Sequence, residues 1–207
     1  MDALENIKSR RSVNYFDPSQ EISDEDIKKI LELSALTPSS LNLQPWEIIA
    51  VKSSDKKKIL RKCAMDQAKV EEASVVFIVI ADINACERNI DSVLKSWVEL
   101  GYMDVKTAVF YKTLPQKLYG EFSSQKRKIF AVKNASFFAM TLMYAARTLG
   151  YETHPMDGFD EDAVKKEFGI SEEKTIPVLI AVGKLSPSAK LLPRAWRKSV
   201  KDFSKIV

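Results

Sequence analysis

NASFFAMTLMYAARTLG, residues 134–150, is the most informative segment of this chain for its architecture. It is the second half of one long helix predicted over residues 124–149, with Gly150 placed as its C-terminal cap. Apolar side chains lie on every face of this helix, so other protein atoms must surround it. The pattern favours a central helix that is shared with a partner subunit. A helix wholly inside one chain is the alternative.

Shorter elements alternate on both sides of this helix. The apolar runs 46–51, 75–81 and 176–183 predict strands, and a short extended piece is expected at 151–153, before a loop over 154–160. Helices are predicted at 3–10, from Ser23 towards Pro38, and at 55–63, 86–123 and 160–168. We therefore expect a three-layer α+β domain with about four strands. Residues 1–207 contain no repeat or linker that would divide it.

Composition is that of an ordinary soluble protein. Of the 207 residues, 45% are hydrophobic and the net charge is only +4, so a packed core is expected. The apolar runs fall short of the roughly 20 residues that a bilayer span needs, and the polar start MDALENIKSRR is unlike a signal peptide. Cys63 and Cys86 fit neither a CxxC pair nor a disulfide framework. We expect a cytoplasmic protein with no membrane span and, with one histidine, no metal site.

The glycines exclude the common phosphate-binding loops. The closest two of the six, Gly150 and Gly158, are eight positions apart. GxGxxG, the Walker loop and the GxSxG elbow all need closer pairs. A nucleotide or flavin phosphate would therefore have to be held by side chains.

The C-terminal tail is basic. Residues 184–205 carry seven Lys or Arg residues against one acid, Asp202. A solvated tail is the simplest reading. Nucleic-acid binding is a weaker one, because Trp196 and Phe203 do not form a repeated stacking platform. The third reading is that one or two of these cations meet a phosphate.

Two polar segments in the N-terminal part could bind a ligand. RRSVNYF, residues 10–16, offers guanidinium groups and a hydroxyl suited to a phosphate, although basic residues also favour a helix C-terminus. TPSSLNLQPW, residues 37–46, suggests a rigid loop rich in hydrogen-bonding groups, with a plain turn as the alternative.

Two further segments follow along the chain. In DQAK, residues 66–69, Gln67 suits the edge of a heterocycle and Lys69 supplies a cation, unless this is a solvated helix face. In HPMDGFD, residues 154–160, Gly158 allows the backbone to approach a flat ligand closely. His154 is expected to be a loop residue that packs, since a Ser/His/Asp triad would rest on this one His with no elbow motif for the nucleophile.

Together, RRSVNYF, TPSSLNLQPWEIIAV, the apolar helix running into LGYETHPMDGFD, and IPVLIAVGKL with a basic tail resemble the FMN-dependent nitroreductase family. The resemblance covers almost the whole chain. It implies an α+β sandwich in which helices flank a central, mostly antiparallel sheet. It also implies an interlocked homodimer with FMN at the subunit interface.

The resemblance assigns the cofactor-binding residues. Those of the first segment bind the FMN phosphate and ring from one side: Arg10, Arg11, Ser12 and Asn14. Those of the second come from the other subunit: Pro38, Ser39 and Ser40, in a loop shaped by Asn42 and Gln44. Gln67 meets the pyrimidine edge of the ring and Lys69 lies nearby. Asn14 stands where many relatives carry a Lys, which is expected to change the flavin potential.

The last two groups lie towards the C-terminus. The resemblance implies that the segment of Pro155, Met156, Asp157 and Gly158 places a backbone N–H at flavin N5 and packs against the ring. In the tail, Arg194 returns to the phosphate, with either Arg197 or Lys198 beside it. The sequence PRAWRK departs here from the family's Lys and Arg separated by one residue, so the second cation is left open.

The function implied is hydride transfer from NAD(P)H through flavin N5 to a nitroaromatic or a quinone, in a ping-pong scheme. No catalytic side chain and no metal are required. The aromatic segment 97–122 would form a substrate lid that includes Tyr119 and Phe122, with core packing as the alternative. Two other functions are weighed: a flavin-binding protein without NAD(P)H turnover, for sensing, storage or another oxidation, and a basic nucleic-acid-binding module.

Overall fold

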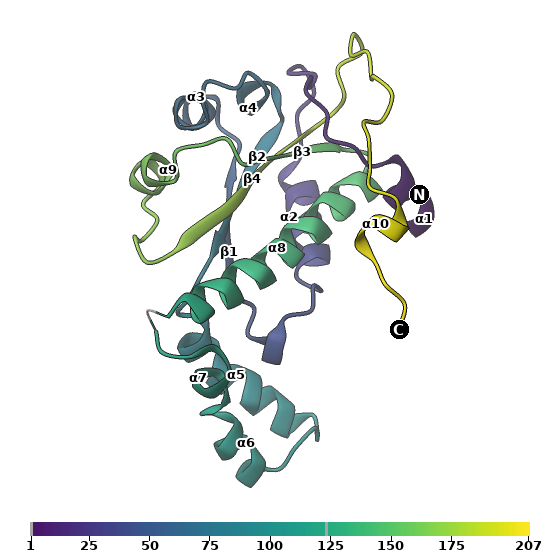
Figure 1. Cartoon of the computed structure of the whole chain (residues 1–207). Helices are drawn as coiled ribbons and strands as arrows, with labels where there is room; N and C mark the ends of the chain where they lie inside the picture. The colour runs from purple at the N-terminus through teal and green to yellow at the C-terminus, as the bar shows by residue number, and fades with distance from the viewer. Residues whose placement is uncertain (1, 123) are drawn as a thin grey trace.

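The computed structural model describes residues 2–122 and 124–207 (Figure 1). Its α-helices are α1 (Ala3–Ser9), α2 (Asp24–Ser34), α3 (Ser54–Cys63), α4 (Lys69–Glu72), α5 (Ala85–Glu99), α6 (Val105–Tyr111), α7 (Leu114–Tyr119), α8 (Gln125–Thr148), α9 (Glu161–Phe168) and α10 (Val200–Phe203). A 3-10 turn, η1, covers Ser40–Asn42.

The described residues form one four-stranded sheet of β1 (Trp46–Val51), β2 (Val75–Ala81), β3 (Glu152–Met156) and β4 (Thr175–Gly183). The strand order is β1-β2-β4-β3, and every neighbouring pair is antiparallel. Strand β2 lies in the interior of the sheet and is buried along its whole length, which its unbroken apolar sequence predicted. The expected antiparallel α+β architecture is confirmed.

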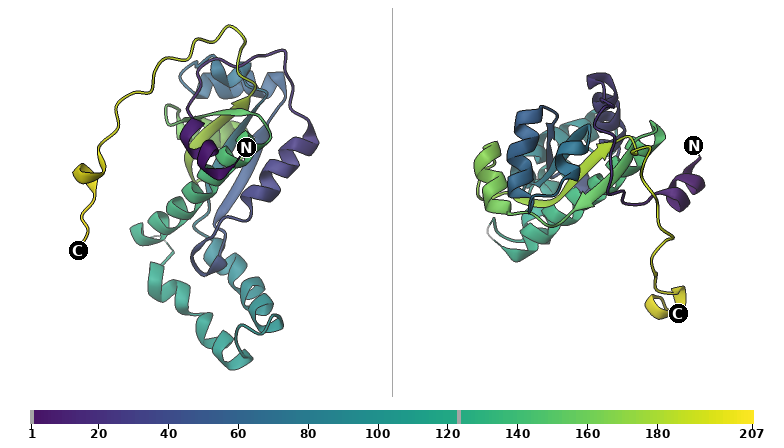
Figure 2. Two further views of the ribbon diagram at one scale, coloured as in Figure 1. Left: turned by 90° about the vertical axis from the view of Figure 1, so that its right-hand side faces the viewer. Right: turned by 90° about the horizontal axis from the view of Figure 1, so that it is seen from above.

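Helices cover both faces of the sheet (Figures 1 and 2). Because side chains alternate along a strand, Phe77 and Val79 of β2 join a core with α2 and α8, while Val76 and Ile78 join a second core with α3, α4 and α9. The sheet therefore separates two hydrophobic cores. This is the three-layer arrangement that the alternation of elements predicted.

Helix α8 crosses one face of the sheet and is covered by its own chain on one side. Ala135, Phe138 and Leu142 are buried, whereas Phe137 of the same helix is 49% exposed. By length and composition α8 could cross a membrane, yet 56% of its most apolar 18-residue window is buried inside the chain. The strip of α8 around Phe137 is the part of the helix surface that its own chain leaves exposed.

Helices α5, α6 and α7 form an arm that projects from the sheet (Figure 1). The single helical pattern predicted over 86–123 is broken where Gly101 and Gly120 adopt positive φ values. Asp104 caps the start of α6 by accepting the Thr107 N–H, so a new helix begins directly after the first break.

Strand β3 corrects one prediction. His154, Pro155 and Met156 lie in this strand, not in the expected loop. Pro155 suggested a loop because it lacks an N–H, but β3 is at the edge of the sheet, where a missing donor is tolerated. The backbone of this segment is thereby fixed against β4.

The last residues leave the body of the protein as an extended tail that ends with α10 (Figure 2). Helix α10 has only four residues and was not predicted. Trp196 is 76% exposed, and Leu192 and Phe203 are also exposed. The tail thus carries large apolar side chains with no cover from its own chain.

Candidate functional site

The first and last of the four polar segments lie side by side. Ser12 forms a parallel bridge with Thr153, and the Val13 N–H donates to the Thr153 carbonyl at 3.2 Å. On the same strand, Nδ1 of His154 lies 2.7 Å from the Val13 carbonyl oxygen. The segment after α1 therefore extends the free edge of β3.

The segment of residues 66–69, which leads from α3 into α4, contacts the last of these segments, residues 154–160. Nε2 of Gln67 donates to the Gly158 carbonyl at 2.8 Å, and Nζ of Lys69 lies 3.5 Å from Nε2 of His154. A Cβ added to Gly158 would lie 3.3 Å from Sδ of Met65, so a larger residue would press on this turn. Three predicted segments thus meet at one place.

A cluster of cations, of which Arg147 is buried, lies beside this meeting point. Arg147 of α8 is 6% exposed and is held by Glu152 at 2.6 Å, Ser9 at 2.8 Å and Asn6 at 3.2 Å. The neighbouring Arg10 is different, since its Nη1 is buried and has no hydrogen-bond partner among the residues the structure describes. Burial lowers the pKa of Arg10, and nearby Arg147 and Arg194 lower it further. Such a group favours an incoming anion.

The tail contributes to the same region. Nη2 of Arg11 donates to the Leu192 carbonyl at 2.6 Å, and Arg194 donates to the carbonyls of Arg10, at 3.0 Å, and Lys8. A cavity of about 590 Å³ lies between the first segment and the tail, lined by Arg11, Ser12, Asn14, Tyr15 and residues 188–192. Among the residues that the structure describes, Arg197 donates only to the carbonyls of Ala195 and Trp196. Arg194 is therefore the tail cation that reaches the cluster.

The segment after α2 lies elsewhere. The Ser40 N–H donates to Oδ1 of Asn134 at 3.0 Å, and the Ser40 hydroxyl bonds that of Tyr119. Asn134 and Arg147 are 13 residues apart on α8, or roughly 20 Å at the helical rise. Pro38, Ser39 and Ser40 are thus held far along α8 from the Arg147 end of the helix, and no hydrogen bond joins them to Arg10 within the described part of the chain.

The loop that carries these residues is unusually constrained. Leu41, Asn42 and Gln44 all have φ values near +50°, which non-glycine residues rarely adopt. The Gln44 N–H donates to the Ser39 hydroxyl at 2.9 Å, and the Gln44 side chain donates to the Asn42 carbonyl at 3.1 Å. Strained backbone of this kind is often found at binding sites.

In the fourth segment, the side chains point to different surroundings. Met156 is buried in the core beneath the sheet, whereas Asp157 is exposed and Pro155 is half-buried. The Met156 side chain is therefore not available to a ligand. A role for it in binding would have to come from its backbone.

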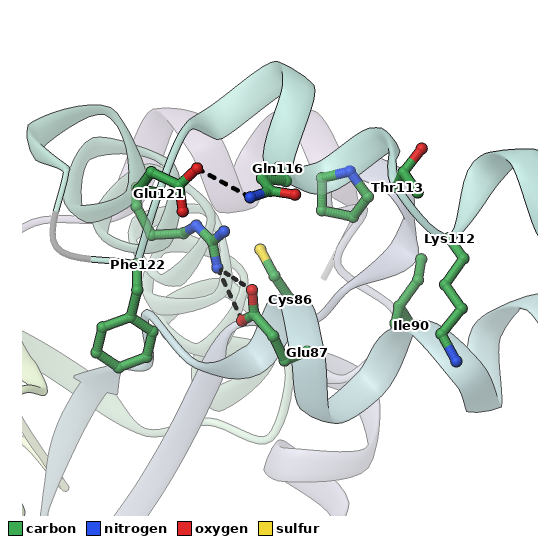
Figure 3. A pocket seen from close by; sticks show the side chains of 10 residues that line it. Cys86, Glu87, Ile90, Lys112, Thr113, Gln116, Glu121 and Phe122 are labelled. Atoms are coloured by element: carbon green, nitrogen blue, oxygen red, sulfur yellow. Dashed lines mark hydrogen bonds and ion pairs between the residues drawn. The ribbon is translucent and has the colours of Figure 1, made fainter.

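A second cavity, of about 330 Å³, lies where the arm joins α8 (Figure 3). Its buried Arg127, 1% exposed, binds both carboxylate oxygens of Glu87, and Gln116 donates to Glu121 at 2.9 Å. Burial raises the pKa of the Cys86 thiol to about 11, so it stays protonated at neutral pH. Most polar groups that line this cavity bind one another, and these contacts anchor the arm.

Of the two aromatic residues expected in a lid, Phe122 lines this cavity, whereas Tyr119 stacks on Phe130 with the ring centroids 4.1 Å apart.

Sequence reasoning missed three features of the site: Asn134, Arg147 and the contact of Lys69 with His154. Asn134 and Arg147 are polar residues within an otherwise apolar helix, and this was a readable signal, because buried polar groups are retained when they have partners. The third depends on the register between β3 and the segment after α1. No local sequence pattern predicts this register.

Comparisons with known proteins point in one direction. The model of the nitroreductase family matches residues 7–184. A candidate NAD(P)H nitroreductase of Bacillus subtilis (strain 168), MhqN, is 32% identical over 197 residues, covering 95% of each chain. The structure of the candidate nitroreductase ydfN from Bacillus subtilis has a TM-score of 0.92 at 30% identity, covering 99% of this chain and 98% of that one. A candidate nitroreductase from Exiguobacterium sibiricum 255-15, solved in complex with FMN, has a TM-score of 0.88 at 28% identity, with 99% and 97% covered.

Proposed function

This chain belongs to the nitroreductase family, and from that premise we propose that it is an FMN-dependent oxidoreductase that passes hydride from NAD(P)H to nitroaromatics or quinones. FMN supplies the hydride chemistry at its N5 atom, and donor and acceptor use the same place in turn, in a ping-pong scheme. We also propose one domain over residues 1–207. The two free, buried cysteines support a reducing, cytoplasmic compartment.

The observation that carries the proposal is the unpartnered Nη1 of Arg10. A buried guanidinium nitrogen without an acceptor is costly, and a phosphate oxygen would satisfy it. Excess positive charge from Arg11, Arg147 and Arg194 supports the same assignment, since Glu152 is the nearby acid. The cavity of about 590 Å³ next to Arg11, Ser12 and Asn14 is within the usual size of a cofactor site.

The remaining residues would orient the flavin ring. Gln67 is fixed by its bond to Gly158 and would present its amide to the pyrimidine edge, with the Lys69 ammonium beside it. Gly158 and the backbone after Met156 would let the chain approach the ring closely. Arg197, which binds only its own neighbours here, would take part only if the tail rearranges.

A homodimer would complete the site. The loop of Pro38, Ser39 and Ser40 lies along α8 from the Arg10 cluster, so it would serve the flavin of a partner subunit. The open face of α8 around Phe137 and the exposed Leu192 and Trp196 of the tail are the apolar surfaces that such a partner would cover.

Spectroscopy of the purified protein tests the proposal. We expect FMN absorbance bands that bleach on anaerobic addition of NADH or NADPH and return with a quinone or a nitroaromatic. Arg10→Met should weaken FMN binding about ten- to a hundredfold, because a charge-assisted bond to phosphate is lost. Lys28→Met, which removes an exposed cation on α2, is the matched control.

Other results would redirect the proposal. Flavin that binds but stays oxidised would indicate a flavin-holding protein without NAD(P)H turnover. A protein that cannot be loaded with FMN, or an Arg10→Met variant that binds it as tightly as Lys28→Met, would refute the site.

A further inference from the structure

His154 is the single histidine of the sequence and lies half-buried where the three joined segments meet. Its Nδ1 is 2.7 Å from the Val13 carbonyl oxygen, and a carbonyl can only accept a hydrogen bond. Nδ1 therefore carries the proton. In the neutral ring, Nε2 is then left with a free lone pair.

The lone pair on Nε2 of His154 faces the ammonium group of Lys69. Nε2 lies 3.5 Å from Nζ of Lys69, and an ammonium can only donate. Lys69 also lies 3.4 Å from Oε1 of Gln67, so its ammonium faces two acceptors, both at long hydrogen-bond distances. One of them is the imidazole.

The charges around the ring keep it neutral. Burial lowers the pKa of His154 below its ordinary value near 6.5, the bond to Val13 raises it, and Lys69 of α4 and Arg10 of the segment after α1 lower it. The charged groups that bear on the ring are both cations. A proton on Nε2 would point at the Lys69 ammonium.

We propose that His154 is a positioning residue that, as its Nδ1–H tautomer, accepts a hydrogen bond from Lys69 and holds this ammonium at the flavin-binding surface. Uptake of a proton by Nε2 removes the acceptor and places two like charges together, so Lys69 turns away. The part of the inference that concerns flavin rests on the proposed function. A cation held there favours negative charge on the bound ring, so the flavin potential is higher while the Lys69 ammonium is held by His154.

NMR of the single histidine tests the hydrogen-bond geometry without flavin. In protein labelled with ¹⁵N-histidine, we expect the Nδ1–H tautomer at pH 7.5 and a ring that titrates below pH 6.5. Lys69→Met should raise the ring pKa, because a neighbouring cation is lost. Lys58→Met, an exposed cation on α3, should not. An Nε2–H tautomer, or equal titration in the wild type and Lys69→Met, would overturn the proposal.

Two substitutions test the flavin part in the loaded protein. The amide of His154→Asn can replace the Nδ1 donor but not the Nε2 acceptor, whereas His154→Gln can place an acceptor near Lys69. We expect the midpoint potential to fall in His154→Asn at pH 7.5 and to be largely retained in His154→Gln.

The two proposals fail in different ways. If neither the wild type nor the variants bind FMN, the proposed function is wrong. The NMR titration still tests the contact between Lys69 and His154 in that case. If all three proteins bind FMN and have the same potential at pH 7.5, the positioning role of His154 is wrong and the proposed function stands.

Discussion

Arg147 and Arg10 are neighbouring cations that the fold treats in opposite ways. A buried charge needs partners, and Arg147 has them in Glu152, Ser9 and Asn6, which tie α1 and β3 to the end of α8. Arg10 shares this environment, yet its Nη1 is unsatisfied within the described residues. The sequence predicted that the Arg10 segment could bind a phosphate, but it could not separate the anchoring arginine from the available one, because their partners come from distant segments.

Stability should depend on pH through His154. Its pKa is lowered in the folded chain, mainly by burial, so above about pH 6.5 the ring is neutral in both states and costs nothing. As the pH falls below this value, the unfolded chain takes up the proton first, and the free energy of unfolding declines until the folded ring is protonated. His154→Asn lacks this titration. Urea unfolding of the FMN-free proteins at pH 7.5 and pH 5.0 should therefore show a larger acid loss in the wild type, and equal losses would contradict the assignment.

Among the elements, α8 has the most connections. Its apolar face packs on the sheet, Arg147 binds α1 and β3, and Asn134 binds the Ser40 backbone while donating to the Phe130 carbonyl at 2.7 Å. One helix thus fixes two predicted binding segments at separate points along its length.

Asn134→Ala should destabilise the protein by about 1–3 kcal/mol, because the Ser40 N–H loses its acceptor at a buried position. Ser136→Ala is the control on the same helix. Its hydroxyl is exposed and bonds only the Val132 carbonyl, so we expect a change within about 0.5 kcal/mol. Urea denaturation measures both, and hydrogen exchange should be faster over residues 39–44 in Asn134→Ala alone. Equal stability of the two variants would show that the Ser40 contact contributes little.

How well an element could be predicted depended on its local signals. Strands β1 and β2 were predicted with their observed bounds, because each is an apolar run between polar turns. The prediction for β3 ended too early, at residue 153, because Pro155 signals a loop. Only the edge position of β3 explains how Pro155 pairs with β4. The division of the arm was missed because its composition is helical throughout: Gly101 separates α5 from α6, Lys112 and Thr113 separate α6 from α7, and Gly120 ends α7. Local propensity contains no information about sheet order or about turns that tertiary packing selects.

At the scale of the whole molecule, the sheet order explains why three of the four segments meet. The order β2-β4-β3 brings β3 to an edge where the segment after α1 can align with it, while Gln67 reaches Gly158. The sequence identified all four segments but not this grouping. Contacts between residues about 140 positions apart, such as Val13 with His154, follow from topology and not from any local pattern.

The segment that stays apart, residues 37–46, points to a surface that one chain leaves open. A cavity of about 240 Å³ joins Pro38, Ser39 and Ser40 to Lys133, Asn134 and the exposed Phe137 of α8. If a partner subunit covers this strip, one substitution should disturb assembly and flavin binding together, because the loop would serve the partner's site.

Phe137→Glu tests this coupling, since it would bury an unpaired carboxylate in the proposed dimer interface. We expect the dimer to weaken by about 2 kcal/mol or more, roughly thirtyfold in its dissociation constant, and FMN affinity to fall with it. Lys166→Glu on α9, across the sheet from α8, is the control for an added acid and should change neither. Analytical ultracentrifugation and FMN titration measure the two effects. A Phe137→Glu variant that remains a dimer and binds FMN normally would exclude this strip from the interface, and one that becomes a monomer with unchanged FMN affinity would show that each chain binds its flavin alone.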